Sequence, residues 1–230
     1  MKFVFFIQKG LLRYNLILTF SLHFMERKRN LLFNNKVNTD GFLFDYFRIS
    51  TLELMANQIN QRNIKGNCAE LGVYRGIFAS KINEYFSDRK LYLFDTFEGF
   101  DSKEMLREKT KGNITEVFDF TKTTIEKVIS IMPHPNNCII KKGVFPNSVD
   151  DLDEKFVFVS LDTDLYNPIY EGLKYFYPRL SLGGTIFIHD YYNERRFKGV
   201  KEAVDKYCFE NALFFVPLSD SCGTVVLSKS

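Results

Sequence analysis

Acidic side chains follow two apolar segments in the second half of the chain. They are Asp162 and Asp164 after segment 156–161, and Asp190 after segment 185–188, where His189 comes directly before it. If the segments are neighbouring parallel strands, these side chains meet at the carboxyl edge of a sheet, where open α/β folds bind ligands. Carboxylates gathered there are unfavourable unless they are solvated, hydrogen-bonded or bound to a metal. The pattern predicts a divalent cation site, for Mg²⁺ with oxygen ligands alone, or for Mn²⁺, Fe²⁺ or Zn²⁺ if the imidazole joins them.

A second candidate site lies in the segment Asn67–Gly76, which reads NCAELGVYRG. The pattern is typical of a buried strand, a glycine turn and the start of a helix. Gly72 and Gly76 lack a Cβ, which allows a tight turn and a close approach of the backbone to a ligand. Asp95 follows nineteen residues after Gly76, at the end of another apolar run. A carboxylate in that place suits the two hydroxyls of a ribose.

The spacing of this turn separates the candidate cofactors. Dinucleotide sites follow G-x-G-x-x-G, whereas this turn reads E-x-G-x-x-x-G from Glu70 to Gly76. An acid in the first position suits a cationic amino-acid group better than a diphosphate, and S-adenosylmethionine carries such a group. An NAD-dependent oxidoreductase and a non-catalytic S-adenosylmethionine-binding protein are the alternatives. The cluster of acids disfavours the second alternative, because a scaffold has no use for it.

Strand and helix patterns alternate along the chain and would position both motifs. A helix is expected over 45–60, and the charged segment 102–113 is expected to be a lid or a solvated loop. Gly183 and Gly184 are expected to form the turn before a strand. Further helices are expected over 77–86, 121–132, 169–177 and 199–208, and strands over 67–71, 91–95, 138–142, 156–161, 185–188, 213–216 and 224–227. The alternation predicts an α/β, Rossmann-like doubly wound fold, mostly parallel, with an antiparallel closing pair of strands.

The composition fits one globular α/β domain. Of 230 residues, 45% are hydrophobic and 26% are charged, which is ordinary for a soluble protein. The net charge of +3 and the lack of a long basic block disfavour a nucleic-acid partner. The cysteines lie far apart in the sequence and show neither a C-x-x-C pair nor the spacing of a zinc site, so we expect reduced thiols and a cytoplasmic protein. They are Cys68, Cys138, Cys208 and Cys222.

The sequence predicts that residues 1–44 form a separate N-terminal extension and that residues 45–230 form the domain. Within it, Leu11–Met25 is apolar but is interrupted by Arg13, Asn15 and His23, so it is too polar for a membrane span. It lacks the cleavage site of a signal peptide. We expect a helix that packs on the domain or on a second subunit of a homodimer. An interfacial membrane helix is the alternative.

Five segments of the chain together resemble the macrocin O-methyltransferase family. They read AELGVYRG, YLFDTFEGF, KGVFPNSV, SLDTDLY and IHDYY, and they occur in this order between about Asp45 and Cys208. The resemblance implies a class I S-adenosylmethionine-dependent O-methyltransferase that acts on a sugar hydroxyl. It also implies a divalent cation, Mg²⁺ or Mn²⁺, and a sugar-containing small molecule or glycan precursor as the acceptor.

The resemblance assigns roles to individual residues. Asp95 would hold the ribose of the cofactor, Asp162 and Asp190 would bind the cation, and Asp164 would be the base for the acceptor hydroxyl. His189 stands where the family usually has an acid, which leaves its role as a ligand open. The implied cofactor-binding residues are Glu70, Gly72, Tyr74, Arg75, Gly76, Asp95, Thr96, Gly143, Phe145 and Asp162.

An extended backbone at the two strand ends gives three further expectations. The side chains of Asp162 and Asp164 would face the same side. The side chain of His189 would point away from that of Asp190, which favours a place for His189 beside the cation rather than on it. Two ionised acids repel, so either Asp162 or Asp190 would have a raised pKa when no cation is bound.

Overall fold

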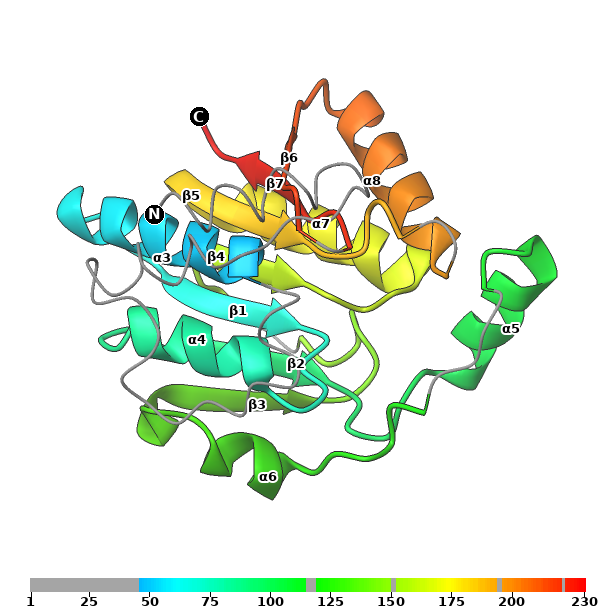
Figure 1. The fold of residues 1–230 in the computed structure, drawn as a ribbon, viewed down its shortest axis with the longest axis horizontal. Coiled ribbons are helices and arrows are strands. Elements are labelled where there is room, and N and C mark those ends of the chain that lie inside the picture. Colours follow the sequence, from blue (N-terminus) through cyan, green and yellow to red (C-terminus); the bar gives the residue numbers. More distant parts are fainter. Residues whose placement is uncertain (1–45, 115–118, 150–151, 194–195, 221) are drawn as a thin grey trace, which may run out of the picture. The chain divides into compact units, whose positions relative to one another are not determined.

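The computed structural model describes residues 46–114, 119–149, 152–193, 196–220 and 222–230 (Figure 1). These residues belong to a compact unit, Phe44–Ser230. The predicted extension over 1–44, including the helix Leu11–Met25, lies outside the described residues. Within the described ranges, no helix combines the length and the apolar character that a membrane crossing requires.

A seven-stranded sheet with the order β3-β2-β1-β4-β5-β7-β6 forms the centre of this unit. The first five strands in that order are parallel, whereas β7 runs antiparallel to β5 and β6 antiparallel to β7. This arrangement confirms the predicted doubly wound fold and its antiparallel closing pair. The strands are β1 (Asn67–Leu71), β2 (Leu91–Asp95), β3 (Cys138–Lys142), β4 (Phe156–Leu161), β5 (Leu180–Ile188), β6 (Val216–Pro217) and β7 (Val225–Ser228).

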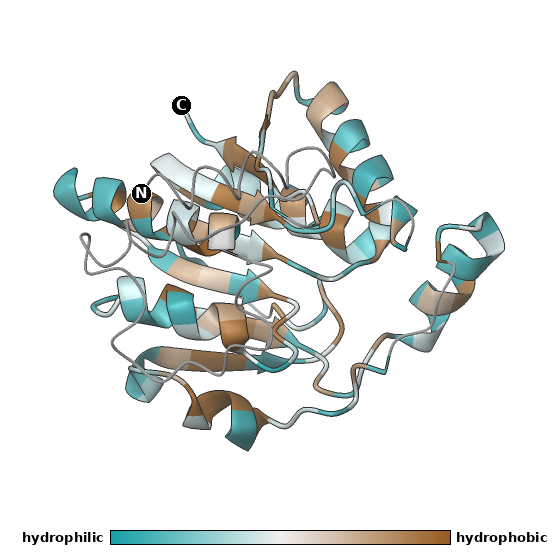
Figure 2. Cartoon of the chain, in the orientation of Figure 1, coloured by the Kyte–Doolittle hydropathy of each residue, from teal (hydrophilic) through white to brown (hydrophobic). Residues whose placement is uncertain are grey.

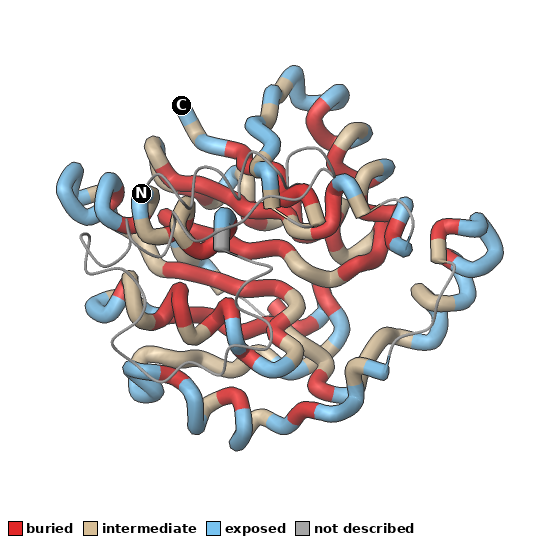
Figure 3. The backbone as a smooth tube through the Cα atoms, in the orientation of Figure 1, coloured by how far each residue is buried: buried red, intermediate tan, exposed pale blue. Residues whose placement is uncertain are grey.

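Helices follow the strands and cover the two faces of the sheet (Figure 1). On one face, Phe86 packs against Phe158 of β4; on the other, Phe176 packs against Phe156 of the same strand. The strands β1, β2, β4, β5 and β7 are therefore buried along most of their length, whereas β3 is half-buried and β6 is exposed, and Figures 2 and 3 show the apolar, buried centre of the sheet. The helices are α3 (Tyr46–Gln61), α4 (Ile77–Tyr85), α5 (Ser102–Lys111), α6 (Ile125–Ser130), α7 (Tyr166–Arg179) and α8 (Lys198–Glu210), with a short 3₁₀ turn, η2 (Pro135–Asn137).

Segment 102–113 was predicted to be a lid or a solvated loop. The prediction of a loop is wrong, because Ser102–Lys111 forms helix α5. Asp101 caps the helix by accepting hydrogen bonds from the backbone of Lys103 and Glu104, and Gly112 ends it in a left-handed conformation. An aspartate before the helix and a glycine after it are signals that the sequence carries. Because the apolar periodicity between these two residues is weak, the sequence pattern did not predict the helix.

The glycine pair before β5 also differs from its prediction. Gly183 and Gly184 lie within the strand, which begins at Leu180. The register between β4 and β5 shifts between Phe156 and Phe158, so the pair sits at an irregularity of the ladder. A Cβ on Gly184 would lie 2.9 Å from the carbonyl oxygen of Ser181, so the crowded backbone there requires a glycine.

Candidate functional site

The ends of β4 and β5 meet as predicted. The two strands pair in parallel up to Leu161 and Ile188, and the backbone of His189 donates to the carbonyl of Leu161 at 3.0 Å. The acids that follow both strands are therefore brought to one edge of the sheet. Asp162, Asp164 and Asp190 each place one carboxylate oxygen, a potential metal ligand, within 4.8 Å of the other two.

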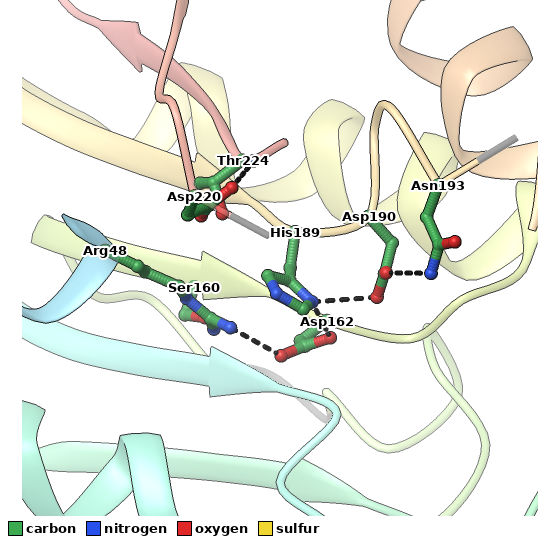
Figure 4. A network of polar contacts seen from close by, with 8 residues as sticks. All are labelled: Arg48, Ser160, Asp162, His189, Asp190, Asn193, Asp220 and Thr224. Atoms are coloured by element: carbon green, nitrogen blue, oxygen red, sulfur yellow. Dashed lines mark hydrogen bonds and ion pairs between the residues drawn. The ribbon is translucent and has the colours of Figure 1, made fainter. Parts of the chain in front are cut away.

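A chain of polar contacts runs through this edge (Figure 4). Nη1 of Arg48 donates to Oδ2 of Asp162 at 3.0 Å. Nδ1 of His189 lies 3.1 Å from Oδ1 of Asp162 and 2.7 Å from Oδ2 of Asp190. Nδ2 of Asn193 donates to Oδ1 of Asp190 at 2.6 Å. Both carboxylates therefore already have positively charged or donating neighbours.

These neighbours reverse the expected pKa shifts. Burial alone would raise the pKa of Asp162, but the His189 imidazolium and the Arg48 guanidinium outweigh it and hold that pKa well below its ordinary value. The pKa of Asp190 is lowered in the same way, by His189 against the effect of burial. Burial would lower the pKa of His189, but Asp162 and Asp190 raise it well above its ordinary value. The expectation of a raised pKa at Asp162 or Asp190 is wrong, because a cation of the chain lies between them.

The raised pKa falls on Asp164 instead. The side chain is buried, and this burial, followed by the charges of Asp190 and Asp162, raises its pKa well above the ordinary value of an aspartate. The backbone of Asp164 has a φ of 61°, so the extended geometry assumed for Asp162 and Asp164 ends at this residue. The site therefore holds its least acidic carboxyl group beside two ionised ones.

The expected orientation of His189 is also wrong. Asp190 has a φ of 60°, a left-handed conformation that turns its carboxylate back toward the imidazole of the preceding residue. Such a conformation is unfavourable for a residue with a Cβ, so the surrounding contacts must hold it. His189 consequently faces both Asp162 and Asp190 rather than pointing away from them.

Arg48 is a functional candidate that the sequence patterns did not indicate. It lies on α3, where its guanidinium also donates to Ser160 at 3.1 Å and packs over the ring of Phe78 at 3.7 Å. Its side chain is 3% exposed. The missed signal is positional, because Arg48 occupies the same helix face as the buried Leu52 and Ala56, four and eight residues later. A cation on an apolar helix stripe indicates a buried anionic partner.

Replacing Arg48 with methionine is expected to destabilise the protein by about 3 kcal/mol, because it leaves Asp162 without its cationic partner. The unbranched methionine side chain retains part of the packing on Phe78. Urea unfolding measures the effect, with Arg62→Met as the control, since Arg62 is exposed just after the end of the same helix. Equal losses in the two variants would show that the ion pair with Asp162 is not what Arg48 contributes.

Glu70 supplies the acid end of the glycine turn. It is buried, and burial is the main cause of its raised pKa, which Arg48 counteracts. Its Oε2 atom is buried without a hydrogen-bond partner among the described residues. An unpartnered buried carboxylate oxygen is unfavourable in isolation. This atom fits the predicted contact with the ammonium group of S-adenosylmethionine.

Gly72 has a structural reason to be a glycine. It has a φ of 88°, and a Cβ there would lie 2.1 Å from the carbonyl oxygen of Asp162. The amide of Asp162 in turn donates to the carbonyl of Leu71 at 2.8 Å. The glycine therefore lets the turn after β1 contact the backbone of the acidic loop directly. The glycine turn and the acidic loop therefore form one packed unit.

Asp95 lies at the end of β2 as predicted, but its carboxylate is already engaged. Oδ2 accepts from the amides of Val73 and Tyr74 at 2.7 and 2.9 Å, and Oδ1 accepts from the amide of Phe97 at 2.7 Å. A carboxylate offers about four acceptor positions, so one remains. Asp95 thus fixes the two loops around the predicted ribose site, and binding of both ribose hydroxyls would require it to release an amide.

The remaining predicted cofactor residues differ in their surroundings. The Tyr74 ring packs against Phe120 with 5.0 Å between centroids, and Arg75 is exposed. Phe145 is buried in the aromatic core, where its ring contacts Phe94 and Phe176. The Thr96 hydroxyl donates to the carbonyl of Gly99, Gly76 caps α4 in a left-handed conformation, and Gly143 has a φ of 141°. Phe145 is therefore a packing residue in this structure, and its predicted contact with adenine stays a prediction.

The doubly wound sheet and a site at the carboxyl ends of its strands agree with the fold of class I S-adenosylmethionine-dependent O-methyltransferases. The family is settled by sequence, since a model of the macrocin-O-methyltransferase family, TylF, matches residues 43–219. The chain belongs to this family. It is 26% identical over 174 residues to the mycinamicin III 3''-O-methyltransferase of Micromonospora griseorubida, a match that covers 70% of this chain and 67% of the relative.

Solved structures share the fold. The O-methyltransferase NovP superposes with a TM-score of 0.61 at 21% identity, covering 80% of this chain and 79% of NovP. The calicheamicin methyltransferase CalS11 has a TM-score of 0.60 at 15% identity, covering 88% of this chain and 90% of CalS11. TomG of Streptomyces achromogenes, solved with S-adenosylmethionine, has a TM-score of 0.56 at 10% identity and covers 90% of this chain and 96% of TomG.

Proposed function

We propose that this methyltransferase transfers the methyl group to a hydroxyl of a sugar, with the help of a divalent cation. The observation that carries the proposal is the convergence of Asp162, Asp164 and Asp190 at the ends of β4 and β5. The acceptor class is supported by relatives, because one is a mycinamicin III 3''-O-methyltransferase and CalS11 is described as a TDP-rhamnose 3'-O-methyltransferase. Both names specify an oxygen as the methylated atom.

The residues of the glycine turn would hold the cofactor. S-adenosylmethionine supplies a methyl group on a sulfonium, which is already activated toward attack. Glu70 would accept hydrogen bonds from its ammonium group through the unpartnered Oε2. Asp95 would accept a ribose hydroxyl at its remaining position while its other contacts hold the turns in place. The contribution of these residues is orientation, which matters because methyl transfer requires an in-line approach.

Asp162 and Asp190 would hold the cation, because their oxygens are hard donors that suit Mg²⁺ or Mn²⁺. A divalent cation bound there would lower the pKa of an acceptor hydroxyl. Asp164 is placed to take the proton from that hydroxyl, since its raised pKa makes it the strongest base of the three carboxylates. Arg48 and His189 would keep Asp162 in place by the contacts described above.

The direct test is incubation of the purified full-length protein with methyl-labelled S-adenosylmethionine, MgCl₂ and a panel of acceptors. The panel contains nucleoside-diphosphate sugars, glycosylated macrolides and free glycans. Transfer of the label to a sugar oxygen, lost on chelation and restored by added cation, is the expected result. Transfer that continues after exhaustive chelation would contradict the role of the cation. Transfer only to catechol-like hydroxyls would contradict the sugar acceptor.

Asp164→Asn is expected to reduce turnover about 10²- to 10³-fold, because an amide cannot take the proton. The wild-type rate should fall as the pH drops through the raised pKa of Asp164. The stability of the wild type should change with pH in the opposite direction. A raised native pKa stabilises the protein below the unfolded pKa, and this contribution is lost as the pH rises through the native pKa. The variant should therefore be at least as stable as the wild type above that pH. Thermal unfolding at acidic and alkaline pH, together with single-turnover kinetics, checks both statements.

A further inference from the structure

Cys222 belongs to a second group of donors at the same edge of the sheet. One ligand atom each of His189, Asp190 and Cys222 lies within 4.8 Å of the other two. His189 and Asp190 follow β5, whereas Cys222 comes from the segment before β7. This group shares Asp190 with the set of three aspartates, but it offers nitrogen and sulfur in place of oxygen. Sequence spacing did not suggest it, because Cys222 is thirty-two residues beyond Asp190.

Backbone contacts hold Cys222 in this place. The amide of Tyr192 donates to the carbonyl of Cys222 at 3.3 Å, which joins its segment to the end of β5. The amide of Thr224 donates to Oδ1 of Asp220 at 2.8 Å and closes a turn around the cysteine. Gly223 has a φ of 69°, and a Cβ there would lie 2.5 Å from the Cβ of Tyr192. The glycine therefore permits the close approach that brings the thiol to the histidine and the aspartate.

The chemistry of this donor set differs from that of the aspartates. Mg²⁺ prefers oxygen ligands, whereas thiolate and imidazole ligands select zinc and similar transition metals. Donor atoms on one tetrahedral Zn²⁺ lie about 3.3–3.8 Å apart, given bond lengths of about 2.0–2.3 Å. The donors of this set could reach such a geometry with side-chain movements of about 1 Å. Three protein ligands also leave a fourth position for water or a hydroxyl, as in catalytic zinc sites.

We propose that His189, Asp190 and Cys222 form a binding site for a divalent transition metal of the zinc type, in addition to the oxygen site of the three aspartates. Because both sites use Asp190, occupation of one excludes full occupation of the other. The inference goes beyond the proposed function, because it adds a second donor set that selects a different class of cation. It does not depend on the identity of the methyl acceptor.

Titration of the reduced full-length protein with CoCl₂ tests the proposal without any activity measurement. A cobalt ion bound to a thiolate gives a sulfur-to-metal charge-transfer band in the near ultraviolet, and carboxylate ligands give none. The wild type is expected to show this band and to lose it on addition of equimolar Zn²⁺ but not of excess Mg²⁺. Cys222→Ser should abolish the band. Cys138→Ser should retain it, because Cys138 is another half-buried thiol that lies outside the group.

A second measurement uses the wild type alone, in case Cys222→Ser does not fold. Zn²⁺ is expected to slow the reaction of one thiol with a thiol reagent, and peptide mapping should identify that thiol as Cys222. Absence of the band in the wild type, its survival in Cys222→Ser, or modification of Cys222 at the same rate with and without Zn²⁺ would each overturn the proposal. Methyl transfer supported by Mg²⁺ in a protein without the cobalt band would overturn this site alone and leave the proposed function standing.

Discussion

Asp162→Asn is expected to lower methyl transfer about 10³-fold and to remove the rise in melting temperature that we expect on binding of a divalent cation. The carboxylate is both a proposed cation ligand and the centre of the contacts with Arg48 and His189. An asparagine retains the shape and one hydrogen bond, but it removes the charge that both neighbours compensate. Because the native pKa of Asp162 is lowered, its carboxylate stabilises the fold above the unfolded pKa, and this contribution is lost as the pH falls through the native pKa. The variant should therefore also be less stable at neutral pH.

Two measurements separate these effects. Single-turnover kinetics at saturating S-adenosylmethionine report the chemical step, and thermal unfolding with and without MgCl₂ reports binding of the cation. Asp153→Asn is the matched control, since Asp153 is exposed near the opposite end of the same strand. The interpretation fails if Asp162→Asn folds normally, keeps its response to MgCl₂ and turns over at the wild-type rate. Its contrast with Asp164→Asn is informative, because the two substitutions should change stability in opposite directions above the native pKa of Asp164.

Gly72→Ala is expected to destabilise the protein by about 4 kcal/mol or to prevent folding. The added Cβ would lie 2.1 Å from the carbonyl oxygen and 2.6 Å from the carbonyl carbon of Asp162. Both are backbone atoms at the end of β4, so the contact cannot be relieved by a rotamer change. Any movement that relieves it displaces the acidic loop from the cofactor turn. Binding of S-adenosylmethionine should be lost together with stability, which calorimetry and urea unfolding can measure.

Two other glycines provide a graded control for this clash. Gly112 has a φ of 70°, and a Cβ there would meet no atom within 4 Å, so Gly112→Ala should cost only the strain of a left-handed residue, about 1–2 kcal/mol. Gly76 has a φ of 74°, but the nearest neighbours of its added Cβ would be side-chain ends of Val128 and Met132 at 2.9 and 3.0 Å. Gly76→Ala should be intermediate. Equal losses in all three variants would mean that backbone conformation alone, and not the contact with Asp162, accounts for the effect at Gly72.

The amino-acid sequence by itself determined the fold and the reaction class. The limits of β1, β2, β3 and β4 agree with the predicted ranges, because buried parallel strands are continuous apolar runs bounded by turn residues. The same runs carry the acids at their carboxyl ends, so the topology brings Asp162 and Asp190 to one edge without further information. Five motifs along the chain, from AELGVYRG to IHDYY, identified the methyltransferase family, which the match over residues 43–219 confirms.

Only the tertiary structure decided how the charges of the site are balanced. Arg48 pairs with Asp162 across 114 residues, and Asp95 is held by three amides from two loops. Local periodicity reports which face of an element is buried, but it does not report which distant side chain meets it there. The left-handed conformations of Asp164 and Asp190 likewise depend on the contacts around them, since a residue with a Cβ disfavours that conformation on its own. These conformations turn the side chains of the site toward one another. The extended geometry expected from the sequence therefore gave the wrong orientation for His189. It also assigned the raised pKa to Asp162 or Asp190, whereas the raised pKa belongs to Asp164.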